Sequence, residues 1–220
     1  MATLRAILFD FDGLILDTET ACYGGWKWVF ENHGLKYPLE DFQRIVGTDK
    51  SPRPLLEARL GSSVDWDSVD AGRREYEREL GQDMEIKPGV FELLKSARSK
   101  GWRRAVVSSS PRHWVHPHLE RRGVSELFED FICHGDAPRA KPAPDLYFEA
   151  LRRLELSGAE TVALEDSYNG SMAAKQAGIW CVAVPSDITR TMDFSHVDLI
   201  TEDLEQLTLE RLIEEFRTKD

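Results

Sequence analysis

The chain has 220 residues, of which 41% are apolar and 30% are charged, and it contains ten Phe and six Trp residues. This composition excludes a wholly disordered or collagen-like chain, and the length suits one large domain or a core domain with an insertion. The 28 Lys and Arg residues against 39 Asp and Glu residues give a net charge of -11, which argues against general binding to nucleic acid polymers or anionic membranes.

The longest uninterrupted apolar run, residues 179–184, is too short to span a bilayer, and the residues before Asp10 lack the apolar region of a secretory signal. We therefore expect a cytoplasmic protein, and we expect it to be a monomer. The three cysteines, Cys22, Cys133 and Cys181, show no paired spacing. Their number and spacing predict free thiols rather than a disulfide framework or a cysteine-based zinc site.

The first predicted element is a strand at residues 6–9, a continuously apolar run of the kind that is buried on both faces of a parallel sheet. Residues 17–84 then contain helical patterns but no strand-like run. A first helix, which packs Trp26 and Trp28 inside this segment, ends at Gly34. Further helices are predicted over residues 39–46, 54–60 and 73–80, the last of them charged and solvated.

This pattern predicts two domains. Residues 17–84 form a helical cap domain, and residues 1–16 and 85–220 together form the core domain that carries the catalytic residues. The chain returns to the core through a linker near residues 85–89.

Three more continuously apolar runs follow, at residues 105–107, 162–164 and 181–184, and segments with helical spacing alternate with them. Gly101 and Gly178 occupy positions expected of helix C-terminal caps. The alternation predicts an α/β fold with a Rossmann-like, doubly wound parallel sheet. A last amphipathic helix over residues 204–216 is predicted to cover this sheet.

A helix is also predicted to begin near Pro111. It carries three histidines, His113, His116 and His118. Because these positions do not all share one helical face, we expect them on a solvated surface and not in a metal site.

Polar residues follow three of the predicted strands. Asp10 and Asp12 come directly after the first, with Gly13 permitting a sharp turn. Serines occupy residues 108–110 after the second, and an acidic pair and a serine occupy residues 165–167 after the third. Because ligands of open α/β sheets bind beyond the carboxyl ends of the strands, we expect these groups to converge on one site.

Convergence would bring four carboxylates together: Asp10, Asp12, Glu165 and Asp166. Like charges at such spacing remain ionised only if a cation joins them, and Mg²⁺ suits a few carboxylates completed by water and a substrate phosphate. A calcium loop of the helix-loop-helix type is excluded because it requires its Gly at the sixth position, whereas Gly13 is fourth.

Each of these features alone also has a structural explanation. The serines at 108–110 can cap the helix that follows them, and Asp166 or Ser167 can cap a helix over residues 168–177. Lys141, which precedes two prolines, can be a solvated loop charge. The conjunction of the features, in a fixed order, is what points to a catalytic site.

That conjunction resembles the haloacid dehalogenase superfamily of phosphoryl-transfer enzymes, and most closely its phosphatase and beta-phosphoglucomutase-like branch, in which a helical cap follows the first strand. The matching stretches lie toward both ends of the chain. They are ILFDFDGLILDTE at residues 7–19, VVSSS at 106–110, KPAPDLY at 141–147 and LEDSYNG at 164–170.

The resemblance implies a Mg²⁺-dependent phosphatase that acts on a small phosphorylated metabolite. Asp10 would attack phosphorus and form an aspartyl-phosphate, because phosphoryl transfer needs in-line positioning and charge neutralisation more than a strong base. Asp12 would protonate the leaving alcohol and then activate water. The dehalogenase and phosphonate-cleaving branches lack this second Asp.

The resemblance also implies the binding groups. Mg²⁺ would be held by Asp10, by the backbone carbonyl of Asp12 and by Asp166, with Glu165 in or just outside the coordination shell. The phosphate would be held by Ser108 and by the backbone at Ser109, and Lys141 would neutralise the nucleophile and the transferred group.

Contacts that select the substrate are expected from Thr18, Glu19, Lys50 and Arg112. A sugar phosphomutase of the beta-phosphoglucomutase type is the main alternative, but similar mutases carry a His four residues after the Thr that matches Thr18, and this chain has Cys22 there. A non-catalytic protein that binds a phosphorylated ligand is the third possibility, and the intact motif set disfavours it.

Overall fold

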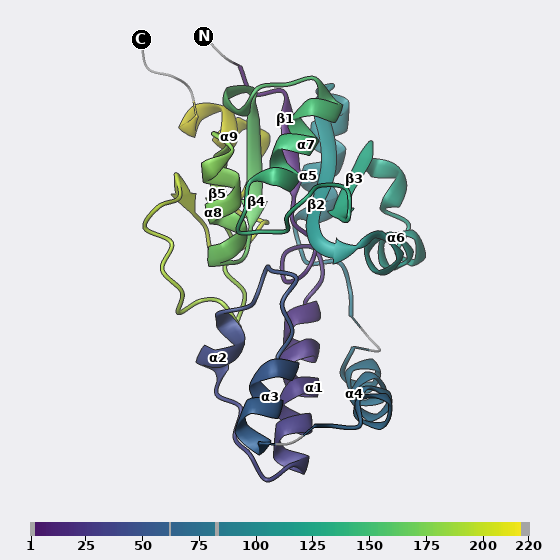
Figure 1. Cartoon of the computed structure of the whole chain (residues 1–220). Coiled ribbons are helices and arrows are strands. Elements are labelled where there is room, and N and C mark those ends of the chain that lie inside the picture. Colours follow the sequence, from purple (N-terminus) through teal and green to yellow (C-terminus); the bar gives the residue numbers. More distant parts are fainter. Residues whose placement is uncertain (1–2, 62, 82–83, 217–220) are drawn as a thin grey trace.

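The computed structural model describes residues 3–61, 63–81 and 84–216. In these residues a parallel sheet of six strands has the order β3-β2-β1-β4-β5-β6, so the chain moves outward from β1 in both directions (Figure 1). The predicted α/β fold with a doubly wound parallel sheet is confirmed. The strands are β1 (Ala6–Phe9), β2 (Arg103–Pro111), β3 (Asp130–His134), β4 (Thr161–Glu165), β5 (Trp180–Ala183) and β6 (Leu199–Ile200).

Helices cover both faces of the sheet because successive strand residues point to opposite sides. Ile7 and Phe9 of β1 pack in a cluster with α5, α6 and α9. Ala6 and Leu8 pack in a second cluster with α7 and α8. The core helices are α5 (Val90–Ser99), α6 (Arg112–Arg121), α7 (Asp145–Leu154), α8 (Tyr168–Gln176) and α9 (Leu209–Glu215), with short 3-10 helices η1 (Ser125–Leu127) and η2 (Gly158–Glu160).

Four helices lie between β1 and α5, and they form the lower lobe in Figure 1. They share a hydrophobic cluster that contains Trp26 and Phe30, and Ile188 from the segment between β5 and β6 also packs in it. Helix α4 approaches α1 closely at Gly25, where a Cβ atom would lie 2.4 Å from Cγ of Glu77. The four helices are α1 (Thr18–Asn32), α2 (Leu39–Gln43), α3 (Arg53–Leu60) and α4 (Trp66–Leu80).

Several predicted details were wrong. Strand β3 was not predicted because its apolar run is short and lies between Asp130 and His134, and the two-residue strand β6 gave no pattern at all. Helix α9 spans only Leu209–Glu215 of the predicted residues 204–216. Helix α4 begins at Trp66 and is not wholly solvated: Asp70 is buried, and the guanidinium of Arg73 lies 4.7 Å from the centre of the Trp26 ring.

The register of the sheet aligns the strand ends that carry the polar residues. Phe9 pairs with Val106 of β2 on one side and with Leu164 of β4 on the other. The next residue along each strand is therefore Val107, Asp10 or Glu165, and these three positions form one row across the sheet. Cys22, Cys133 and Cys181 are free thiols, as predicted.

None of the helices in the described parts of the chain combines the length and the apolar composition needed to cross a membrane.

Two glycines that flank α5 provide a test of the packing between core elements. Gly89 and Gly101 both have left-handed φ values, +85° and +74°. A Cβ atom at Gly89 would lie 2.4 Å from the backbone carbon of Leu204, whereas one at Gly101 would meet no atom of the described residues within 4 Å. Gly101→Ala should therefore cost about 1–2 kcal/mol of unfolding free energy from backbone strain, and Gly89→Ala about 1–3 kcal/mol more from overpacking. Urea unfolding of both variants measures the difference, and equal losses would contradict this packing.

Candidate functional site

The site begins where β1 ends. Asp10 continues the strand, since its backbone N–H donates to the carbonyl of Leu164 at 3.0 Å. The chain then turns sharply at Gly13, which has φ +79° and whose N–H donates to the carbonyl of Leu16 at 2.7 Å. A side chain at Gly13 would collide with Asp166, because a Cβ atom there would lie 2.1 Å from Asp166 Oδ2. Gly13 is thus required both for the sharp turn and for the close approach of the Asp166 carboxylate.

A buried lysine ties the strand ends together. The ammonium of Lys141 has no solvent exposure and donates to three oxygens: Asp10 Oδ1 at 2.8 Å, the carbonyl of Val107 at 2.7 Å and Glu165 Oε1 at 2.6 Å. An ammonium has three N–H donors, so each donor has an acceptor. Tyr147 of α7 adds a hydrogen bond to the same Oε1 of Glu165.

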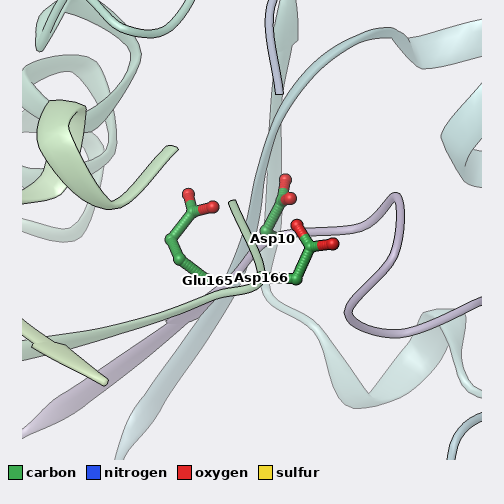
Figure 2. A group of neighbouring side chains, drawn as sticks. All are labelled: Asp10, Glu165 and Asp166. Carbon is green, nitrogen blue, oxygen red and sulfur yellow. The ribbon is translucent and has the colours of Figure 1, made fainter. Parts of the chain in front are cut away.

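Asp10, Glu165 and Asp166 bring their carboxylates together, with one oxygen of each lying within 4.8 Å of the others. Figure 2 shows the three side chains side by side at the ends of β1 and β4. Glu165 Oε2 and Asp166 Oδ1 are buried and have no hydrogen-bond partner among the described residues. Buried carboxylate oxygens without a donor are costly, so this donor set fits a bound cation.

The electrostatics of the cluster lead to the same conclusion. Burial raises the pKa of Asp10, and the charge of Lys141 only partly offsets this effect. Burial and the charge of Asp10 raise the pKa of Glu165 to about 8, and burial with the charges of Asp10 and Glu19 raises the pKa of Asp166 well above its ordinary value. A single ammonium therefore does not compensate three buried carboxylates, and a cation would restore their ionised forms.

The Asp12 side chain lies apart from this group and is held by four donors. Its Oδ1 accepts from Thr18 Oγ1 at 2.7 Å and from Trp114 Nε1 at 3.1 Å. Its Oδ2 accepts from Ser110 Oγ at 2.6 Å and, more weakly, from Ser108 Oγ at 3.4 Å. Four carboxylate side chains were expected in one cluster, but only Asp10, Glu165 and Asp166 form it, and the Asp12 side chain lies outside it.

The serines lie at the end of β2, on the far side of Asp12. Ser108 Oγ accepts from the backbone N–H of Ser110 at 2.9 Å. Ser109 Oγ donates to the carbonyl of Gly47 at 2.8 Å and accepts from the backbone N–H of Lys141 at 3.3 Å. Helix α6 has no side-chain cap bond at Pro111, so these hydroxyls do not serve as its cap. By contrast, Ser167 caps α8 by accepting from the N–H of Gly170 at 3.1 Å.

Above the carboxylates, a cleft of about 1160 Å³ separates the sheet from helices α1 and α4. Asp10 and Asp12 line its floor, together with Ser108, Ser109 and Ser110. Among the residues expected to contact a substrate, Thr18, Glu19 and Lys50 line this cleft.

Arg112 is not among the residues that line the cleft, so its contact with a substrate stays a prediction. Its guanidinium bonds the carbonyl of Phe131 and lies within 3.9 Å of carboxylates of Asp130 and Asp136, because the first turn of α6 directs this side chain toward β3. The histidines of α6 were misjudged in part. His118 is half-buried, lines the cleft and lies 4.4 Å from the ring of Trp114, measured between ring centres.

Three residues of the site were not found from the sequence. Tyr147 lies in the first turn of α7, and its position within KPAPDLY gave a weak signal. Lys87 donates to the carbonyl of Gly13 at 2.9 Å from the segment that returns from α4 to α5. Trp114 faces Asp12 only because α6 begins directly after β2. The contacts of Lys87 and Trp114 depend on tertiary placement, so no local pattern could have indicated them.

Comparison with known proteins identifies the family. Residues 7–184 match the family described as Haloacid dehalogenase-like hydrolase, so the chain belongs to this family, and the resemblance inferred from the sequence motifs is confirmed. The "Putative phosphatase YhcW" of Bacillus subtilis (strain 168) is 36% identical over 219 residues, which cover 99% of this chain and 100% of that protein.

Two further matches agree. The "Phosphorylated carbohydrates phosphatase" of Thermotoga maritima is 29% identical, over 80% of this chain and 82% of that protein. The crystal structure of CbbY from Rhodobacter sphaeroides in complex with phosphate has a TM-score of 0.74 and 26% identity, and the match covers 93% of this chain and 96% of that one. The chain is thus similar, over 80% or more of its length, to two proteins named as phosphatases.

The raised pKa of Glu165 predicts how stability depends on pH. In the presence of a chelator, the unfolding free energy of the native chain should fall as the pH rises from about 4.5 to 8, because the unfolded chain releases the Glu165 proton before the folded chain does.

Removing the buried ammonium tests the same electrostatic account. Lys141→Met leaves the carboxylates without their counter-ion and should cost about 3–5 kcal/mol near pH 8, and less near pH 5, where the carboxyls hold protons.

Lys50→Met, in the same cleft but exposed, is the matched control and should cost little at either pH. Urea unfolding at the two pH values measures the losses. A Lys141→Met loss that does not grow with pH would contradict the assigned charge balance.

Proposed function

We propose that this hydrolase is a Mg²⁺-dependent phosphatase that cleaves a small phosphomonoester through an aspartyl-phosphate at Asp10. The observation that carries the proposal is the placement of Asp10, on the floor of the cleft, against two buried carboxylates with unpartnered oxygens and the ammonium of Lys141. Phosphatase activity in the relatives' names supports the reaction class.

In the first step an oxygen of Asp10 attacks phosphorus while the bond from phosphorus to the substrate alcohol breaks. Asp12 gives a proton to the departing oxygen, so a neutral alcohol leaves. Lys141 stays bonded to Asp10 and keeps positive charge beside the nucleophile. Ser108 and the backbone at Ser109 would hold phosphate oxygens at the end of β2.

In the second step water attacks the phosphorus of the aspartyl-phosphate. Asp12, now a carboxylate, takes the proton of the attacking water, and the bond from phosphorus to Asp10 breaks. Inorganic phosphate leaves with Asp10 restored as a carboxylate. One residue thus acts as acid and then as base, which requires Asp12 to reach the same side of the phosphoryl group in both steps.

The proposed cation site lies at the carboxylates of Asp10, Glu165 and Asp166. We infer that Asp10, Asp166 and the backbone carbonyl of Asp12 hold Mg²⁺, with Glu165 beside it, because Glu165 already bonds Lys141 and Tyr147 through one oxygen. When bound, Mg²⁺ supplies positive charge for the phosphate oxygens that gain charge during transfer. Gly170 leaves space for the Glu165 side chain, since a Cβ atom there would lie 1.9 Å from Glu165 Oε2.

The helices between β1 and α5 suit a cap over the site. We propose that residues 17–84 act as this cap, and that residues 1–16 and 85–220 form the catalytic core. The cleft wall formed by both parts includes Lys50, Arg74 and Arg121, none of which forms an ion pair in the described residues. These cations would attract a small anionic metabolite despite the negative charge of the whole chain.

Asp10→Asn tests the nucleophile. Because an amide oxygen is neither charged nor a competent nucleophile, release of phosphate from p-nitrophenyl phosphate with Mg²⁺ should fall by about 10³-fold or more. Asp67→Asn, an exposed carboxylate in the first turn of α4, should leave the rate unchanged. Equal rates for Asp10→Asn and the native chain would refute the proposed function.

Asp166→Asn tests the cation site by a readout other than turnover. Mg²⁺ binds ionised carboxylates, so it should raise the thermal midpoint of the native chain, and by more near pH 8 than near pH 6. The variant keeps the size of the side chain but loses its charge, so most of this shift should disappear. An unchanged shift in Asp166→Asn would place the cation elsewhere.

A further inference from the structure

Trp114 stands out because it is an exposed aromatic side chain on the cleft wall that also makes a specific polar contact. It is 41% exposed, it lies in the first turn of α6, and its indole N–H donates to Asp12 Oδ1 at 3.1 Å. Packing against His118 explains why the ring is there, but it does not explain why the N–H points at the carboxylate that the reaction needs as acid and base.

The four donors around Asp12 are not equivalent. Thr18, Ser108 and Ser110 offer hydroxyls, which can either donate or accept a hydrogen bond. The indole N–H of Trp114 can only donate. Each hydroxyl can therefore reverse its role when Asp12 becomes protonated, whereas Trp114 always needs an acceptor at Oδ1.

This difference decides which oxygen of Asp12 carries a proton. On Oδ1, only Thr18 Oγ1 could accept a proton, and the indole N–H would then face a protonated oxygen, which is a weaker acceptor than a carbonyl oxygen. A proton on Oδ2 faces Ser110 Oγ at 2.6 Å and Ser108 Oγ at 3.4 Å, and either hydroxyl can accept it. Both serines belong to the end of β2, the side of the cleft where the phosphate would be held.

We propose, on the basis of the function proposed above, that Trp114 is a positioning residue: its indole N–H fixes the Asp12 carboxyl group so that the acidic proton lies on Oδ2, toward the phosphate-binding serines. It acts through Asp12 and transfers no proton itself. Loss of the N–H would leave the carboxyl free to hold its proton on either oxygen, and only one of these forms could protonate a leaving group.

The test uses two aryl substrates that differ in leaving group. p-Nitrophenolate departs readily without a proton, whereas the leaving group of phenyl phosphate depends on the general acid. Trp114→Phe keeps the ring and removes only the N–H. Its kcat/KM for phenyl phosphate should fall by about tenfold, part of the 10²–10⁴ that general acid catalysis contributes, while kcat/KM for p-nitrophenyl phosphate should change less than about twofold.

Trp28→Phe is the matched control, because Trp28 stacks on Tyr76 at 5.8 Å between ring centres and does not line the cleft. It should leave the ratio of the two kcat/KM values unchanged. An unchanged ratio in Trp114→Phe, whether both rates stay constant or both fall together, would overturn the role of Trp114. Asp10→Asn separates the two hypotheses: if it is inactive and the Trp114→Phe ratio is unchanged, only the inference about Trp114 fails.

Discussion

The site depends on one buried ammonium group that joins three strands. Lys141 bonds Asp10 after β1, the Val107 carbonyl in β2 and Glu165 at the end of β4. These three positions form one row of the sheet, so the register that builds the core also places the acceptors for a single cation. Burial opposes the charge on Lys141, but the carboxylates of Asp10 and Glu165 outweigh it and raise the pKa of Lys141. The lysine stays charged beside the carboxylate that the proposed reaction uses as its nucleophile.

Small residues make this concentration of charge possible. Gly13 and Gly170 leave the space that Asp166 and Glu165 occupy, since a Cβ atom at either glycine would overlap a carboxylate oxygen. The carboxylates can therefore approach each other at strand ends instead of pointing into solvent. Their partly unsatisfied oxygens cost stability in the absence of a cation. The core has large apolar clusters on both faces of the sheet, which can offset that cost.

The sequence was most informative at the ends of the buried strands, where an apolar run gives way to polar residues. Buried parallel strands favour continuous apolar runs, so Asp10 and Asp166 could be placed at strand ends without coordinates. Lys141 lies in the loop between β3 and α7, and only the family resemblance of its motif indicated it. The short strand β3 could not be, because three apolar residues between Asp130 and His134 do not distinguish a strand from a loop. The direction of Arg112 and the contact of Trp114 follow from how α6 packs on the sheet, which no local pattern specifies.

Asp12 connects the two parts of the molecule. Thr18, the first residue of α1, donates to Asp12 Oδ1, while Ser110 at the end of β2 donates to Oδ2. One oxygen is thus held from the inserted helices and the other from the sheet. Helix α1 continues into the wall of the cleft, so Thr18 ties the start of this helix to Asp12 Oδ1. The position of the helices over the cleft and the orientation of the proposed acid and base are therefore physically linked through a single hydroxyl group.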